Sequence, residues 1–376
     1  MAKTLDEHFS YLADRTKLER YQAAIAAVVG PEQVVLDLGC GSGSLGLMAL
    51  RAGARKVLFV EEGPIIEAAR RTIAGAGLSR RAEFIQGNSF ELSLPERVDT
   101  VLCDHIGFFG FDYGVLSLLA DARQRFLKPG GLIIPAAIDL GLAPVESEVC
   151  RDLVARWHDG SLPEEYAWLA SSAANTKHAV RLGPEDLLAG PNVLAMLQLG
   201  DEAEPFLSWE TEFRCSRDGL IDGFAGWFDC LLAHGIRMTN SPLAAKSLDR
   251  PQAYLPLEMP LRVSQGEVVR VTVMARHLDN VVAWVVELPR SNTRFAHSTF
   301  NGLLLDREAI TRAHPDRRAR LNDRGRARRL VLSYCDGQRT AAEVEALIQR
   351  DHPDLFPSAK ATSSFIRQVL AWDTKE

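Results

Sequence analysis

The sequence predicts an α/β domain built on a doubly wound parallel sheet, followed by a β-rich domain and a small helical domain. Apolar runs typical of buried strands alternate with helix-period segments in the first third of the chain. Alternating apolar and polar runs separated by Gly and Pro dominate the middle, and an arginine-rich stretch with short helix-like runs comes last. At 376 residues, 47% of them hydrophobic, the chain can form several hydrophobic cores.

The first domain is expected over residues 1–138. Its predicted strands are VVLDLG, KVLFVEE, AEFIQG, TVLCDHIG and GGLIIP, and the segments between them, such as GPIIEAARRTIAGAG, have helical spacing. Short buried strands that alternate with helices are typical of a parallel sheet covered on both faces.

The end of the first strand carries the strongest functional signal. Asp37 is followed by Gly39, Gly41 and Gly43, and a glycine-rich turn into a helix presents bare backbone N–H groups to a ligand. The next strand ends at Glu61, where a carboxylate can accept hydrogen bonds from a ribose diol. An acid before a GxGxG turn favours a ligand with a cationic portion, and S-adenosylmethionine meets both requirements. The alternative is that the glycines only make a tight turn.

A β-rich second domain is expected over residues 139–290, with a helical insertion near CRDLVARWHD. The third domain is expected over residues 291–376. This block holds 15 Lys and Arg against 11 Asp and Glu, whereas the whole chain has a net charge of −6. Charge is therefore polarised along the sequence.

Several classes of protein are not expected. The six cysteines form no CxxC pair and no cluster with histidine, so neither a metal site nor a disulfide framework is predicted. The N-terminus has no basic-then-apolar leader, and no uncharged apolar run reaches the length of a membrane span. A cytoplasmic location without membrane contact is expected.

The motifs VVLDLGCGSG, AGARKVLFVEE, VDTVLCDHIGFFGFDYGVL and FLKPGGLIIP resemble, in order and spacing, the protein arginine methyltransferases. GWFDCLLAHGIRMTNSP and PLRVSQGEVVRVTVMARHLDN are similar to the barrel domain of that family, and HFSYLADRTK is similar to its cofactor-covering helix. The resemblance spans about residues 8–290. It implies a Rossmann-like methyltransferase domain, a β-barrel-like domain and a homodimer formed through a helical arm at about 150–173.

The resemblance also implies which residues bind the cofactor and its product S-adenosylhomocysteine. Lys17 stands where the family has a carboxylate-binding arginine, and it offers a point charge in place of a bidentate fork. Asp37 and the glycines correspond to the methionine portion, and Glu61 to the ribose. The full implied set is His8, Lys17, Asp37, Gly39, Gly41, Gly43, Glu61, Asn88 and Ser89.

The acceptor side departs from the family. Its two guanidinium-clamping glutamates fall on Asp104 and Tyr113, with Asp112 one residue earlier, and its Thr-His-Trp loop falls on LDRPQ, Leu248 to Gln252. Bidentate recognition of arginine depends on carboxylate geometry, so arginine is not the expected acceptor.

A different acceptor fits the residues that replace the clamp. An ammonium must lose a proton before it can attack a methyl group, and Asp104 or His105 could accept that proton, with His105 better matched to neutral pH. Phe108, Phe109, Phe111 and Tyr113 could form a box for a methylated ammonium. The alternative is that the histidine and the aromatic residues only pack. The candidate catalytic residues are Asp104, His105, Asp112 and Tyr113.

The C-terminal block resembles the PqqD-like winged-helix domains that recognise precursor peptides of ribosomally made natural products, over about residues 299–376. Thr340 with Glu343 predicts a capping box, and Phe365, Val369 and Leu370 predict one apolar helix face. The resemblance implies that a leader peptide pairs as a strand near FNGLLLD and packs on the last helix.

Two other interpretations of this block remain open. Seven arginines between Arg317 and Arg329 could bind nucleic-acid phosphates, or they could form a solvated face or subunit contact. The acidic overall charge and the absence of interleaved aromatic residues argue against nucleic acid.

The predicted function is S-adenosylmethionine-dependent N-methylation of an amine, terminal or on a side chain, in a precursor peptide captured by the C-terminal domain. The alternatives are arginine methylation of a protein or peptide, O-methylation of a small molecule, methylation coupled to nucleic-acid binding, and a catalytically silent scaffold. The intact glycines and Glu61 argue against the last.

Overall fold

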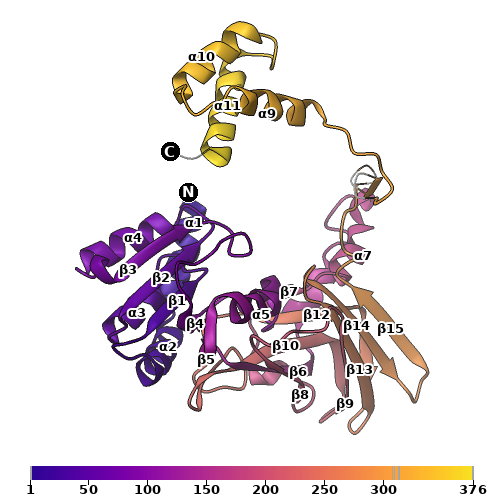
Figure 1. Ribbon diagram of the computed structural model, residues 1–376. Helices are drawn as coiled ribbons and strands as arrows, with labels where there is room; N and C mark the ends of the chain where they lie inside the picture. Colours follow the sequence, from indigo (N-terminus) through magenta and orange to yellow (C-terminus); the bar gives the residue numbers. More distant parts are fainter. Residues whose placement is uncertain (1, 307, 309, 312–313, 375–376) are drawn as a thin grey trace. The chain divides into compact units, whose positions relative to one another are not determined.

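The computed structural model describes residues 2–306, 308, 310–311 and 314–374 (Figure 1). It divides into two compact units, Met1–Leu303 and Leu304–Glu376. The first unit contains a parallel sheet with its helices and, after it, two antiparallel sheets.

The first third of the chain forms a five-stranded sheet. Its strands lie in the order β3-β2-β1-β4-β5, and all neighbours are parallel. The elements are α1 (Ala2–Ala13), α2 (Arg15–Val28), β1 (Val34–Leu38), α3 (Ser44–Arg51), β2 (Lys56–Glu61), α4 (Ile66–Gly75), β3 (Ala82–Gln86), β4 (Val98–Leu102), α5 (Val115–Arg125) and β5 (Leu127–Ile134). The predicted α/β fold is confirmed.

The order of the strands decides where a ligand can bind. The chain moves outward from β1 to β3 and then returns to β4 on the other side of β1, so β1 and β4 flank the point where the strand order reverses. In doubly wound sheets, ligands bind at the carboxyl ends of the strands at this point. Every residue of β1 is buried, as expected for a central strand covered on both faces.

Two antiparallel sheets make up the rest of the first unit. One has the order β7-β12-β10-β6-β8, with β11 paired to β10, and the other has the order β15-β14-β13-β9. The strands are β6 (Ala137–Val145), β7 (His178–Val180), β8 (Asn192–Gln198), β9 (Leu207–Arg214), β10 (Gly219–Ala233), β11 (Ile236–Thr239), β12 (Gln252–Val263), β13 (Val268–Arg276), β14 (Val281–Leu288) and β15 (Thr293–Ser298). These sheets form the β-barrel-like region, which the sequence predicted.

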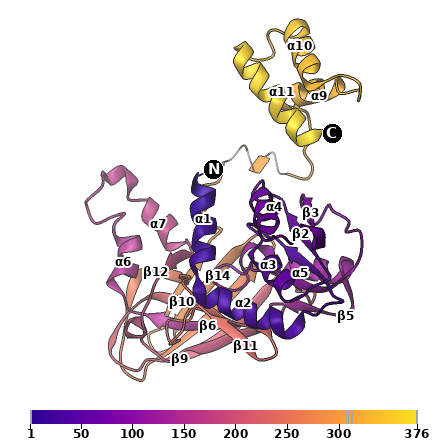
Figure 2. The same cartoon turned by 90° about the vertical axis from the view of Figure 1, so that its left-hand side faces the viewer.

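The helix α2 joins the two regions. It packs against α3 on one side and against β10 and β11 on the other (Figure 2). The Tyr21 side chain on this helix is completely buried, and its hydroxyl donates to the Cys103 carbonyl over 2.8 Å. The N-terminal helices therefore connect the end of β4 to the barrel.

The predicted helical insertion lies between β6 and β7. It contains α6 (Glu148–Ala155) and α7 (Leu169–Ala174). Exposed apolar side chains lie along this segment, including Val149, Leu162, Tyr166 and Trp168. The homodimer that the resemblance implies stays a prediction.

The first unit ends later than expected. The third domain was expected from residue 291, but β15 pairs with β14 from Thr293 to Ser298 and therefore belongs to the barrel-like region. The second compact unit begins at Leu304.

The second unit is helical in the part that the structure describes. It contains α9 (Asp323–Ser333), α10 (Ala341–Asp351) and α11 (Ala359–Asp373), whose inner faces share one small core. The capping box of Thr340 and Glu343 is confirmed, and Phe365 and Val369 are buried. The resemblance implies that a leader peptide pairs as a strand near FNGLLLD, but the described residues offer no sheet edge there, because residues 300–302 form a turn and residues 304–306 pair with no strand.

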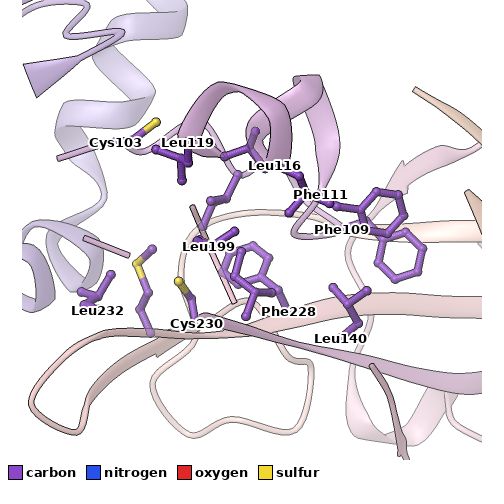
Figure 3. Close-up of a cluster of buried hydrophobic side chains, with 14 of the residues drawn as sticks. Cys103, Phe109, Phe111, Leu116, Leu119, Leu140, Leu199, Phe228, Cys230 and Leu232 are labelled. Carbon is purple, nitrogen blue, oxygen red and sulfur yellow. The ribbon is translucent and has the colours of Figure 1, made fainter. Parts of the chain in front are cut away.

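A buried cluster joins the loop after β4 to the barrel (Figure 3). Phe109 and Phe111 are at most 1% exposed, and their ring centroids lie 5.0 Å apart. Phe109 also fits against Gly226 of β10, where an added Cβ would lie 2.3 Å from the ring. The predicted aromatic box is therefore wrong for these two residues, because they fill the core between the domains.

We expect Phe109→Ala to lower the free energy of unfolding by about 3–5 kcal/mol, because it leaves a cavity in this core. Urea denaturation followed by circular dichroism measures the change. Phe206→Ala is the control, since Phe206 is 57% exposed and its truncation should have little effect. A similar small loss for both variants would contradict the assigned packing.

Candidate active site

A cavity of about 570 Å³ opens at the carboxyl ends of β1, β2 and β4. Its walls come from α1 and α2, from the glycine turn, from the loop after β4, and from the barrel segment at Arg250 and Pro251. A second cavity of about 390 Å³ adjoins it and shares Gly39, Glu61, His105 and Tyr113 with it. Both volumes lie in the range of small-molecule sites.

The glycines of the turn have different reasons for lacking a side chain. Gly41 has φ +51°, and an added Cβ would lie 2.9 Å from the His8 ring of α1. Gly43 has φ +81°, and its Cβ would lie 2.8 Å from that of Ala69 on α4. Gly39 opens toward the cavity, where the nearest atom to its Cβ would be His105 Nδ1 at 3.8 Å. The turn thus serves helix packing at Gly43 and leaves bare backbone facing the cavity at Gly39.

Glu61 is held in place by backbone donors at the junction of the two cavities. Its Oε2 accepts from the Gly41 N–H over 3.0 Å, and its Oε1 accepts from the Gly63 N–H over 2.8 Å. Each carboxylate oxygen has a second lone pair, so both can also accept from a ligand hydroxyl. Asn88 and Ser89 line the second cavity, on the other side of Glu61.

Asp37 lies beneath the turn and is only 1% exposed. Burial raises the pKa of Asp37 to about 7, against the effect of the Gly46 N–H, which donates to Oδ2 over 2.7 Å. Glu61 and Asp104 raise this pKa further by repulsion. A cation placed in the cavity would favour the charged form of Asp37.

Asp104 is paired with two cations from distant parts of the chain. Lys17 Nζ lies 2.7 Å from Oδ2, and Arg250 Nη2 lies 3.3 Å from both carboxylate oxygens. Arg250 also donates through Nη1 to the Gly107 carbonyl over 2.9 Å. Burial opposes ionisation, but Arg250 and Lys17 hold the pKa of Asp104 below its usual value. Asp104 is therefore a charged and weakly basic carboxylate.

His105 and Tyr113 line both cavities. Their rings meet edge to face with centroids 5.4 Å apart. Tyr113 has φ +57°, an uncommon backbone conformation that turns its side chain at the start of α5. Phe108 also lines the larger cavity, so two of the four predicted box aromatics, Phe108 and Tyr113, border it.

Asp112 does not reach either cavity. Its Oδ2 accepts from the backbone N–H groups of Phe108 and Phe109 over 2.9 and 2.7 Å, and its Oδ1 pairs with Lys177. The side chain is 1% exposed. A direct catalytic role for Asp112 is contradicted by this placement, because the carboxylate is engaged in shaping the loop.

Asn240 connects the two loops that face each other across the cavity. This fully buried side chain donates to the Phe108 carbonyl over 2.9 Å and to the Pro251 carbonyl over 2.7 Å. Its Oδ1 accepts from the Phe228 N–H of β10 over 2.9 Å. The position of Arg250 relative to Asp104 is therefore fixed by the barrel.

The structure brings most of the predicted site residues together. The larger cavity is lined by His8, Lys17, Asp37, Gly39, Gly41, Glu61, Asp104, His105 and Tyr113. Sequence reasoning missed Arg250, Tyr21 and Lys177. Arg250 stands in the LDRPQ segment, where the family has its Thr-His-Trp loop. A cation at a position where the family has none was the signal that could have indicated a functional role.

Among the described residues, no group of three or more His, Cys, Asp or Glu side chains could hold a metal ion. No helix in the described part of the chain combines the length and apolar character needed to cross a membrane.

Comparison with known proteins identifies a methyltransferase. The family model described as "Methyltransferase domain" matches residues 35–131. Protein arginine N-methyltransferase 6 of Xenopus laevis is 30% identical over 237 residues, which cover 59% of this chain and 68% of that protein. Protein arginine N-methyltransferase PRMT10 of Arabidopsis thaliana is 25% identical over 313 residues, covering 74% and 82% respectively.

Solved structures share the fold. The Trypanosoma brucei PRMT1 enzyme-prozyme heterotetrameric complex with AdoHcy superposes with a TM-score of 0.69 at 19% identity, covering 77% of this chain and 96% of that one. An open conformation of Arabidopsis thaliana protein arginine methyltransferase 10 gives a TM-score of 0.67 at 22% identity, covering 78% and 96%.

We expect binding of S-adenosylmethionine to weaken as the pH falls below about 7. The folded-state pKa of Asp37 is about 7, so its carboxylate is charged above that pH and protonated below it. Because a cationic ligand favours the charged form, the affinity should fall about tenfold from pH 8 to pH 6. Isothermal titration calorimetry across this range measures it.

The control is Asp37→Asn, whose affinity should be weaker and nearly independent of pH over the same range. Equal pH dependence in the variant and the natural chain would assign the titration to another group.

Proposed function

The chain belongs to the protein arginine methyltransferase family and is an S-adenosylmethionine-dependent methyltransferase, and from this premise we propose that its acceptor is an amine nitrogen of a peptide. The cofactor supplies an electrophilic methyl group on a sulfonium. Asp37, Glu61 and the backbone of the glycine turn would hold it, with Asn88 and Ser89 at its adenine end and His8 and Lys17 at its amino-acid end.

The observation that carries the proposal is the state of Asp104. Both of its carboxylate oxygens already face Arg250, and one also receives Lys17. A substrate guanidinium needs carboxylates with both oxygens available, because the strong arrangement is a pair of parallel hydrogen bonds. The second clamping position holds Tyr113, which lacks a carboxylate. The acceptor side is thus poorly suited to arginine.

The same side suits an amine. A nitrogen that attacks a methyl group needs a free lone pair and close alignment with it. His105 lies at the junction of the two cavities, and histidine is the side chain that most often acts as a general base. Asp104 is a weak base, because its pKa is lowered by Arg250 and Lys17 despite burial. We assign the general base to His105 and the shaping of the acceptor side to Asp104 and Arg250.

Arginine methylation is the second candidate. Relatives that the chain matches over two thirds or more of their length are named protein arginine N-methyltransferases, and this name is the observation that favours it. A family fold supports a shared cofactor chemistry more directly than a shared acceptor.

Acceptor peptides distinguish the two candidates. We expect the full-length enzyme to methylate a peptide with a free terminal or lysine amine at least about a hundredfold faster than a matched peptide whose only acceptor is arginine, a difference of about 2.7 kcal/mol in transition-state stabilisation. Tandem mass spectrometry locates the methyl group. Preferential methylation of the arginine peptide would reverse the assignment.

The second unit supplies the other part of the proposal, capture of the substrate peptide. A groove of about 470 Å³ lies between α9 and α11, and its apolar floor includes Phe365, Val369 and the 78% exposed Trp372. Arg324 and Arg328 border it against the single acid Asp373. Apolar surface with an excess of positive charge fits a peptide segment that carries apolar and acidic residues. Such tethering raises the local concentration of the acceptor end of the same peptide.

The occupant we propose is the leader segment of a ribosomally made precursor peptide. Since the described part of this unit contains no strand, the peptide would lie in the groove of the two helices, in place of the strand pairing that the sequence suggested. The nucleic-acid alternative differs in its salt dependence, because phosphate contacts weaken steeply with added salt.

We expect Trp372→Ala to raise the KM for a leader-bearing peptide about tenfold, a loss of about 1.4 kcal/mol of binding free energy, and to leave kcat unchanged. Steady-state kinetics with the full chain measures both constants. Leu304→Ala is the matched control, an apolar side chain that is 71% exposed in the same unit and lies outside the groove. An unchanged KM for Trp372→Ala would exclude this groove as the docking site.

A further inference from the structure

The loop that follows β4 contains a buried carboxylate that no proposed step of the reaction uses. Asp112 is 1% exposed, and its Oδ2 accepts from the backbone N–H groups of Phe108 and Phe109 over 2.9 and 2.7 Å. An added Cβ at Gly107 would lie 2.3 Å from the Asp112 side chain, so the loop closes tightly around this carboxylate. A charged group withdrawn from water in this way is costly unless a cation lies against it.

The cation comes from a distant part of the chain. Lys177 Nζ donates to Asp112 Oδ1, and the lysine side chain is itself only 8% exposed. Its Nζ also lies 5.1 Å from the centroid of the Phe108 ring and 3.5 Å from Asn280 Oδ1. The attraction of an ammonium to an aromatic face adds to the ion pair. Lys177 therefore contacts both the carboxylate that shapes the loop and the ring of a residue that borders the larger cavity.

The backbone around Lys177 is held in place by the barrel-like region. Lys177 lies between α7 and β7, at the end of the helical insertion. Just before it, the Asn175 side chain accepts from the Ser298 N–H of β15 over 2.8 Å. Just after it, β7 pairs with β12. A fixed segment of the barrel-like region therefore presents the lysine to Asp112.

The same loop is also fixed through its carbonyl groups. Arg250 donates to the Gly107 carbonyl over 2.9 Å, and Asn240 donates to the Phe108 carbonyl over the same distance. Asp112 binds the N–H groups while these two donors bind the carbonyls, so the backbone of the loop is held from both sides. Loss of the cation behind Asp112 would leave one of these two sets of hydrogen bonds unsupported.

We propose that Lys177 is a positioning residue for the acceptor. By offsetting the charge of Asp112, it keeps the loop folded so that Phe108 and Tyr113 form the acceptor wall of the cavity. Tyr113 directly follows Asp112 and has φ +57°, so its placement depends on the same turn. The inference rests on the proposed function for the assignment of this wall to the acceptor. Lys177 is not among the described residues that line either cavity, so it acts through the loop and not by touching a substrate.

The cofactor side is held by other hydrogen bonds. Glu61 accepts from the backbone N–H groups of Gly41 and Gly63, and Asp37 accepts from that of Gly46. None of these donors belongs to the loop after β4. A defect confined to that loop should therefore lower turnover of the acceptor and leave binding of S-adenosylhomocysteine nearly unchanged.

The first measurement follows the loop itself and needs no acceptor. The full chain is labelled with fluorotyrosine, and its fluorine NMR spectrum is recorded with S-adenosylhomocysteine bound. The chain has six tyrosines, and Tyr113→Phe identifies the signal of Tyr113. In Lys177→Met this signal should move or broaden, because the loop relaxes. In Lys177→Arg, which keeps the cation, the signal should stay where it is in the natural chain.

Kinetics supplies the second measurement. The peptide with a free terminal or lysine amine serves as acceptor, and kcat is expressed per S-adenosylhomocysteine-binding site, counted by calorimetry. Because a small displacement of the groups that orient an acceptor is costly, Lys177→Met should lower kcat about a hundredfold and change the Kd of S-adenosylhomocysteine less than about threefold. Lys177→Arg should recover most of the activity. A purely structural lysine would change the number of sites and leave kcat per site unaltered.

Arg151→Met is the matched control. Arg151 comes from the same helical insertion and pairs with Asp222, whose carboxylate is 0% exposed and also accepts from the Ser147 N–H over 2.9 Å. Neither member of this pair is among the described residues that line the two cavities. Loss of this cation should lower stability much as loss of Lys177 does, but it should leave the Tyr113 signal and kcat per site unchanged.

The outcomes separate this inference from the proposed function. An unmoved Tyr113 signal or an unchanged kcat per site in Lys177→Met overturns the positioning role, and so do equal losses in Lys177→Met and Arg151→Met. Failure of every amine peptide as acceptor, with transfer to the arginine peptide, overturns the proposed function. The arginine peptide then serves for the kinetics, and the fluorine spectrum still tests Lys177. Should Lys177→Met give no S-adenosylhomocysteine-binding sites, Lys177→Gln removes the same charge and keeps a donor for Asp112.

Discussion

The partial burial of the charged Asp104 carboxylate is the constraint on which the site depends. A charged carboxylate withdrawn from water is costly unless cations and hydrogen bonds compensate it. Here the compensation comes from Lys17, 87 residues earlier in the chain, and from Arg250, 146 residues later. One carboxylate at the end of β4 therefore holds the N-terminal helix, the parallel sheet and the barrel in register around a single cavity. Removing either cation would leave charge that the remaining partner only partly offsets.

On the cofactor side, carboxylates that are withdrawn from water are stabilised by different groups. Asp37 and Glu61 are compensated by backbone N–H groups of the glycine turn and its neighbours, and not by cations. Such neutral donors leave the negative charge largely available, which explains why burial raises the pKa of Asp37 to about 7. The carboxylates of the turn therefore keep their charge available where a sulfonium and an ammonium would lie, whereas the charge of Asp104 is offset by Lys17 and Arg250.

The parts of this arrangement that the sequence could predict are those encoded locally. The strands around Asp37 and Glu61, the glycine turn between them, and the capping box at Thr340 are patterns within a few residues of one another. Arg250 could not be placed in the same way, because its partner lies in another domain and its own segment, LDRPQ, has no intrinsic preference for a carboxylate. The predicted aromatic box after Asp104 was wrong in part for a related reason. Phe109 and Phe111 are buried in a core formed with distant barrel strands, whereas Phe108 and Tyr113 border the cavity.

Membership of a methyltransferase family supports the identity of the cofactor more strongly than the identity of the acceptor. The residues that would hold the cofactor belong to the parallel sheet and its first turn, in the N-terminal part of the chain. This part is similar to relatives that are named protein arginine N-methyltransferases. The acceptor side is formed by two loops, 104–113 and 248–252. Asn240 donates to both loops, and Arg250 of the second donates to the Gly107 carbonyl of the first. Loops tolerate substitution without loss of the fold, so a single change there can alter which acceptor the site binds. The arginine at position 250 occupies the Asp104 carboxylate with a guanidinium from within the protein.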